Sequence, residues 1–118
     1  MTPQEAKASY RRFLAQYETV TVRRYSGTGT NRSFVEAANC RARVIGARGN
    51  DPVLAGTVTQ ANQKVIVYAD DIANGLTLPV TDNDKLVISG KEHAIKAVDD
   101  VSRRINGVLI AYEFMVRG

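Results

Sequence analysis

The stretch DKLVISGKEHAIKAVDDVSRRINGVLIAYEFMVR, from Asp84 to Arg117, decides the fold. Its apolar residues 86–88 run into Ser-Gly, where Gly90 can take the positive φ that a two-residue hairpin turn demands. Residues 94–98 return, and after a polar connection ending in Asn-Gly the apolar run 108–116 follows. The pattern predicts three consecutive antiparallel strands, a meander long enough to form the back wall of a small β domain.

Three further strands are expected before this meander. Residues 19–25 are β-branched and alternating, residues 34–45 form a longer run, and residues 64–69 are almost entirely apolar. In the longer run, one face is predicted to carry Phe34, Ala38, Cys40, Ala42 and Val44. Cys40 would then be a buried and unreactive thiol.

The N-terminus predicts one amphipathic helix over about residues 3–16. Thr2 and Glu5 form a T-x-x-E capping box, with proline at the first helical position. The expected apolar face consists of Ala6, Tyr10, Phe13, Leu14 and Tyr17. This face would cover the β domain or pack on a partner subunit. The whole chain is therefore expected to be one mainly β (α+β) domain over residues 1–118, a small antiparallel β-barrel of about six strands with one N-terminal helix.

The connections between these elements are polar and hold most of the acidic residues. Asp70-Asp71 and Asp99-Asp100 are expected to be solvated turn residues, and residues 82–84 a polar turn. Arg103-Arg104 would be either solvated or paired with acids on a neighbouring copy. The long segment 46–63 and the glycine-rich segment 26–33 are the loops most typical of a functional role.

The composition excludes several classes of function. With one cysteine no internal disulfide is possible, which favours synthesis in a reducing compartment. One histidine, His93, and no Cys-x-x-Cys pair argue against a zinc site or a catalytic triad, so no metal, no cofactor and no enzymatic activity are expected. No apolar run is long enough to span a membrane. The net charge of +4 is uneven, because residues 1–48 hold nine Lys or Arg against three acids.

The order of turns and strands in residues 64–118 resembles the C-terminal half of tailed-phage head–tail joining proteins. These are the small head-completion or head-closure (stopper) proteins of phages, prophages and gene transfer agents. The resemblance also includes the strand at 65–67 and the turn at 70–71. Its remaining residues are Asp84, Leu86, Ile88, Gly90, Ile95, Val98, Gly107, Leu109, Tyr112 and Arg117.

The resemblance implies a structural protein of the virion neck, made in the bacterial host cytoplasm. It would assemble as a homo-oligomeric ring, by analogy a dodecamer, under the portal or adaptor protein. The ring would continue or gate the channel for packaged DNA and dock the tail or a tail-terminator protein. Ring formation can depend on the portal, so an isolated chain could be a monomer.

Position and composition suggest two loops for contact with the channel or a partner. The first candidate set is Arg48, Asn50, Asp51, Val53, Leu54, Thr57 and Gln60, and the second is Thr28, Asn31 and Arg32.

Two alternatives stay open. One is another neck component, an adaptor or a tail-completion protein, although an adaptor is expected to be mostly helical. The other is a small basic β-barrel module that binds nucleic acid, for which the basic first half of the chain is the main indication.

Overall fold

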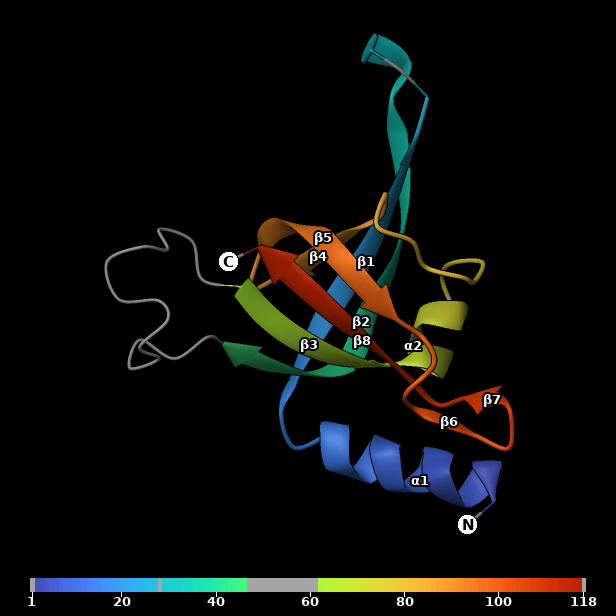
Figure 1. Cartoon of the computed structure of the whole chain (residues 1–118). Helices are drawn as coiled ribbons and strands as arrows, with labels where there is room; N and C mark the ends of the chain where they lie inside the picture. The colour runs from blue at the N-terminus through green and yellow to red at the C-terminus, as the bar shows by residue number, and fades with distance from the viewer. Residues whose placement is uncertain (1, 28, 47–61, 118) are drawn as a thin grey trace.

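Six antiparallel strands close into a barrel at the centre of the computed structural model, which describes residues 2–27, 29–46 and 62–117 (Figure 1). The strand order around the barrel is β1-β2-β3-β8-β5-β4. The strands are β1 (Glu18–Ser26), β2 (Ser33–Gly46), β3 (Asn62–Tyr68), β4 (Lys85–Ile88), β5 (Lys91–Asp99) and β8 (Ala111–Arg117). The predicted mainly β fold, a six-stranded antiparallel barrel with an N-terminal helix, is confirmed.

The C-terminal meander is formed by β4, β5 and β8. Between β4 and β5, Ser89 and Gly90 have φ values of 52° and 80°, as a tight two-residue hairpin turn of primed type requires. The predicted single strand 108–116 is wrong in one respect, because it is interrupted at Ile110. The N–H of Ile110 donates to the carbonyl of Arg103, and its own carbonyl accepts from Ala69. Residues before it form a separate small hairpin of β6 (Arg104–Ile105) and β7 (Val108–Leu109).

A β-bulge in β2 overturns the predicted faces of that strand. Val20 of β1 pairs with Cys40, but Val22 pairs with Ala37, so β2 has one extra residue between these two pairs. Asn39 in this interval has a φ of 58°. The extra residue changes the alternation, so that Ala37 is buried while Phe34 and Ala38 are exposed. Cys40 and Ala42 are buried, as predicted.

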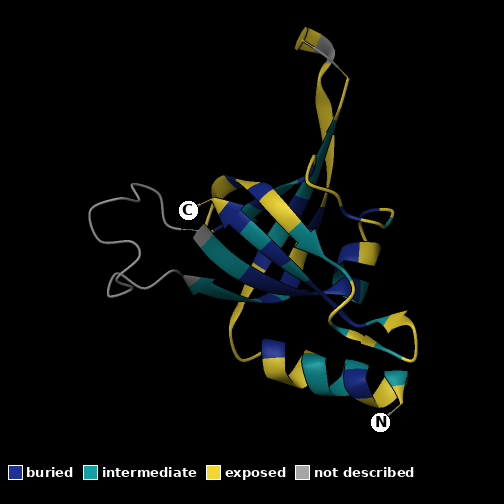
Figure 2. Cartoon of the chain, viewed as in Figure 1, coloured by how far each residue is buried: buried dark blue, intermediate teal, exposed yellow. Residues whose placement is uncertain are grey.

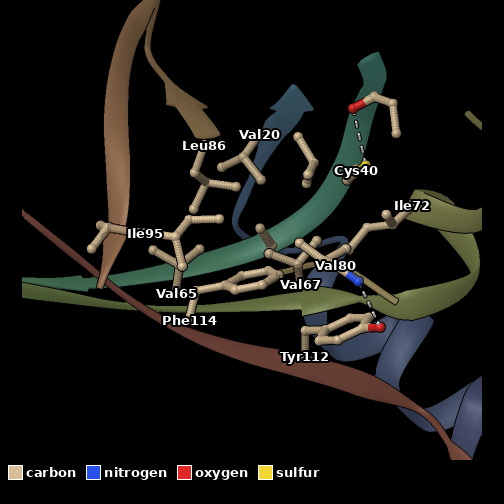
Figure 3. Packing of buried hydrophobic residues seen from close by; sticks show 14 of the residues in the cluster. Val20, Cys40, Val65, Val67, Ile72, Val80, Leu86, Ile95, Tyr112 and Phe114 are labelled. Carbon is tan, nitrogen blue, oxygen red and sulfur yellow. Dashed lines mark hydrogen bonds between the residues drawn. The ribbon is translucent and has the colours of Figure 1, made fainter. Parts of the chain in front are cut away.

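The interior of the barrel is filled by side chains from all six strands and from the segments that close its ends (Figure 3). Tyr112 and Phe114 stack at its centre with their ring centroids 5.3 Å apart. The Tyr112 hydroxyl accepts a hydrogen bond from the N–H of Val80, in the loop before β4 (Figure 3). A buried tyrosine normally needs such a partner, and this bond ties the loop to the core.

The helix α1 (Pro3–Leu14) covers one outer wall of the barrel. It starts with the predicted capping box: the Thr2 hydroxyl accepts from the Glu5 N–H, and the Glu5 carboxylate accepts from the Thr2 N–H. Leu14 packs with Ile66 and Tyr68 of β3 in a second buried cluster outside the barrel. One side of α1 therefore covers the β domain, as expected.

Two short helical segments complete the described chain. The helix α2 (Ala69–Ala73) follows β3, where the sequence predicts a turn or a single helical turn, and the 3-10 helix η1 (Gly29–Asn31) lies between β1 and β2. In the residues that the structure describes, no helix is both long and apolar enough to cross a membrane.

Candidate functional site

The hairpin of β1 and β2 extends well beyond the barrel (Figure 1). β1 pairs with β4 only as far as Arg23, and β2 pairs with β3 only from Ala42 onward. Between these points the two strands pair with each other alone. We call residues 24–27 and 29–36 the arm; its outer part is mostly exposed (Figure 2).

Aromatic rings and arginines stack along the arm. Tyr25 and Phe34 face each other across the two strands, edge to face, with centroids 5.6 Å apart. The guanidinium of Arg32 lies 3.8 Å from the centroid of Tyr25, and that of Arg23 lies 4.4 Å from the centroid of Phe34. Such cation–π contacts stabilise a ribbon that has no barrel wall beneath it. Phe34 is nevertheless 47% exposed and Val35 is 59% exposed.

The base of the arm is fixed to the barrel by a buried ion pair. Asp84 is only 2% exposed, and its two carboxylate oxygens accept from Nε and a terminal nitrogen of Arg24 at 2.9 and 3.0 Å. Arg24 also donates to the carbonyls of Thr77 and Pro79, while Asp84 accepts from the N–H of Thr81. The predicted polar turn at residues 82–84 is present, but its Asp84 is buried and pairs with a charge that lies sixty residues away in the chain.

A second set of contacts connects the arm to β5. Arg23 forms ion pairs with Glu36 at 3.0 Å and with Glu92 at 3.2 Å. The Tyr25 hydroxyl also donates to Glu92. This hydrogen bond is the main reason why the pKa of Glu92 is lowered, so the carboxylate stays ionised and continues to attract Arg23. The direction in which the arm leaves the barrel is thus set by contacts on two sides.

The structure describes only two of the predicted loop residues, Asn31 and Arg32. The segment 26–33 is the tip of the arm, where Arg32 stacks on Tyr25 and the backbone of Asn31 belongs to η1. The remaining predicted residues lie outside the described part of the chain; these are Thr28, Arg48, Asn50, Asp51, Val53, Leu54, Thr57 and Gln60.

A second surface lies at the C-terminal end of α1 and in the turn that follows it, next to β2. Phe13 and Tyr17, both predicted to lie on the apolar face, are 39% and 46% exposed. Their rings meet edge to face with centroids 5.2 Å apart. The guanidinium of Arg43, on β2, lies 4.7 Å from the Tyr17 centroid and 5.8 Å from the Phe13 centroid. Phe13, Tyr17 and Arg43 together are called the α1 patch below.

Several charged residues predicted to be solvated are tied into the structure. Asp71 accepts from the N–H of Arg41 at 2.9 Å, next to the β2 bulge, and also forms an ion pair with that side chain at 3.7 Å. Arg103 donates to Tyr10 and Glu113, and Arg104 donates to two backbone carbonyls. Both arginines therefore find partners within the chain.

The cysteine and the histidine singled out from the sequence are both buried in the fold. Cys40 is fully buried, and burial raises the pKa of its thiol to about 12, so the reactive thiolate is scarce near neutral pH. His93 is buried, and its Nδ1–H donates to the carbonyl of Arg117 at 2.7 Å, which ties the end of β8 to β5. Among the described residues, no group of three or more His, Cys, Asp or Glu side chains is arranged to hold a metal ion.

No protein-family model matches this chain, and no curated protein or solved structure is significantly similar to it.

Sequence reasoning singled out the tip of the arm, as segment 26–33, and considered a partner subunit for the helix face. It did not single out Phe34, Val35 or Arg43 as site residues. Phe34 and Val35 are exposed because this part of β2 pairs only with β1, and that pairing cannot be read from the alternation of apolar residues.

Proposed function

We propose that this chain is a structural component of the neck of a tailed phage or of a related particle, a head-closure (stopper) protein. In this role it assembles as a ring under the portal or adaptor, continues the DNA channel and docks the tail. The resemblance of residues 64–118 to head–tail joining proteins suggests the role, and the confirmed barrel and meander are compatible with it.

The arm is the observation that supports an assembly role best. A two-stranded ribbon is marginally stable by itself in water. This one nevertheless presents Phe34 and Val35 to solvent, on the part of β2 that pairs only with β1. Apolar side chains gathered on a projecting element are typical of surfaces that another protein covers. In a ring, a neighbouring copy or the portal would cover them.

The anchoring of the arm also favours docking. Arg24 and Asp84 hold its base, and Arg23 holds its flank to Glu36 and Glu92. Because the arm is already oriented in the free chain, little conformational entropy is lost when a partner binds it. A preorganised arm is what a component of a symmetric ring needs, since every copy must reach its neighbour in the same way.

Complementation of particles tests the proposal. Heads assembled without this protein should lack tails and lose their packaged DNA, and expression of the chain in cells that make every other particle component should restore tailed, infectious particles. The double variant Phe34→Ser/Val35→Ser should fold normally and fail to restore them. The matched control is Val101→Ser, because Val101 is 72% exposed and lies outside the arm.

Two results would refute the assembly role. One is that the wild-type chain restores no infectivity although heads and tails are competent with their native neck. The other is that the arm variant restores infectivity as well as Val101→Ser does.

A nucleic-acid-binding barrel is the second candidate, and the arginine at the arm tip favours it. Arg32 stacks on Tyr25 and forms no ion pair with the described residues. If this module is correct, the isolated chain should bind double-stranded DNA with a steep dependence on salt, and Arg32→Gln should reduce the slope. Weak binding that does not change with Arg32→Gln would exclude it.

A further inference from the structure

The α1 patch is a fixed arrangement of two exposed rings and one cation. Phe13 and Tyr17 lie one helical turn apart in sequence, and Arg43 reaches both rings from β2. The other apolar residues of α1 behave differently, since Ala6 and Leu14 are fully buried against the barrel. Aromatic residues and arginine are the types most enriched where proteins bind one another.

A hollow adjoins this patch and shares one of its residues. It has a volume of about 240 Å³ and is lined by Ser9, Tyr10, Phe13, Ile66 and Arg103. A cavity of about 150 Å³ is large enough for benzene. The hollow between α1 and β3 could therefore hold one leucine or phenylalanine side chain.

Arg103 forms a fixed part of the wall of the hollow. Its terminal nitrogens donate to the Tyr10 hydroxyl at 2.8 Å and to Glu113 at 2.9 Å. These two bonds hold the guanidinium in place between α1 and β8, so the hollow is already formed in the free chain.

The charge around the patch favours an acidic occupant. The guanidinium of Arg43 lies over the two rings, and neither Arg43 nor Arg12, the neighbour of Phe13 on α1, forms an ion pair with any described residue. One carboxylate, that of Glu18, lies beside the patch, because it accepts from the N–H of Val44, the residue after Arg43. Two arginines against one carboxylate leave this face positively charged.

We propose that the α1 face docks an acidic segment of a partner protein. An apolar side chain of that segment fills the hollow beside Phe13, and a carboxylate pairs with Arg43. The inference goes beyond the proposed neck role and does not depend on ring formation, because every residue that carries it belongs to a single chain.

The geometry favours a protein over single-stranded nucleic acid. Proteins that bind single strands offer ring faces on which successive bases stack. Here the rings meet edge to face, and the cation lies over both of them. The hollow next to them is lined largely by apolar and aromatic side chains, which suits an apolar side chain better than a phosphate backbone.

Short synthetic peptides provide the test. The probe is a fluorescent peptide in which a Leu-Phe pair is flanked by glutamates. One control peptide has Ser-Ser in place of Leu-Phe, a second has lysines in place of the glutamates, and oligo(dT) is the nucleic-acid probe. Fluorescence anisotropy measures binding to the full chain, and amide NMR shifts locate it. We expect the acidic Leu-Phe peptide to bind best and to shift the amides of Phe13, Tyr17 and Arg43.

Matched variants separate the α1 face from other exposed residues. Phe13→Ser and Arg43→Gln should each weaken binding of the acidic Leu-Phe peptide by about tenfold, which is the effect of a typical hot-spot residue. Val101→Ser removes an exposed apolar side chain outside the arm and the α1 patch, and Lys91→Gln removes a charge from an exposed residue at the start of β5, so both should leave binding unchanged.

Three outcomes would overturn the proposal. The first is that no acidic peptide binds at millimolar concentration. The second is that Ser-Ser binds as well as Leu-Phe, or that Phe13→Ser has no effect, since the hollow then plays no part. The third is that oligo(dT) binds through Arg43 while the acidic peptides do not, which would assign the face to nucleic acid.

Discussion

Replacing Tyr112 by alanine should be among the most damaging single changes in this protein. The side chain is 1% exposed, stacks on Phe114, and accepts a hydrogen bond from Val80 at 3.2 Å. Removing a large buried aromatic ring costs about 3–5 kcal/mol, because transfer energy is lost and a cavity remains. Leaving the Val80 N–H without its partner adds about 1 kcal/mol. We expect Tyr112→Ala to lower the free energy of unfolding by about 4–6 kcal/mol.

Urea denaturation followed by circular dichroism measures this loss, with the slope on urea concentration checked for two-state behaviour. Tyr112→Phe is the matched control, because it keeps the stacked ring and removes only the hydroxyl. It should cost about 1–2 kcal/mol, and it remains measurable if the alanine variant is largely unfolded. A loss below about 1 kcal/mol for Tyr112→Ala would contradict the burial of this ring. Equal losses for the two variants would show that the hydrogen bond, not the packing, dominates.

Three further predictions test the arm anchor, the bulge and a turn. Arg24→Met should lower the free energy of unfolding by about 2–4 kcal/mol, since Asp84 would keep a buried charge without its partner. The double variant Arg24→Met/Asp84→Leu should lose less stability than Arg24→Met alone. Equal losses for the two variants in urea denaturation would show that the ion pair is unimportant. Gly75→Ala should cost about 1–3 kcal/mol, because the new Cβ would lie 2.6 Å from the Cα of Ala37; an unchanged melting temperature would mean that the backbone moves apart freely. The pKa of Asp99 is lowered from 3.8 to about 2, chiefly by the hydrogen bond from the serine hydroxyl three residues further on. Its contribution should therefore be present above about pH 4 and be lost as the pH falls toward 2, so a urea midpoint that varies identically with pH in wild type and Asp99→Ala would refute this.

Local sequence signals predicted most of the architecture. The capping box at Thr2 starts a real helix, and Ser89-Gly90 forms the expected turn because both residues adopt positive φ. The alternation of apolar residues identified each barrel strand, since in a closed barrel every strand turns one face inward. These signals span a few residues each, which is why they are visible without knowledge of the tertiary structure.

The errors arise where distant parts of the chain meet. Nothing near Asp84 in sequence shows that Arg24 will cover it, and nothing near Arg103 shows that Glu113 and Tyr10 will be its partners. Phe34 is exposed because its part of β2 pairs with β1 alone, beyond the reach of β3. The candidate interaction surfaces are made of such long-range features, so they became visible only in three dimensions.

The closure of the barrel has a consequence for how another chain could attach to this one. In the described residues, β3, β4, β5 and β8 each have a hydrogen-bonded neighbour on both sides, although β4 pairs with β5 only as far as Ala94. Along the arm, β1 beyond Arg23 and β2 before Ala42 bond only to each other. A strand from a second molecule could therefore extend the barrel sheet by main-chain hydrogen bonds along the arm. Productive strand addition and unwanted edge-to-edge aggregation would compete for the same two edges.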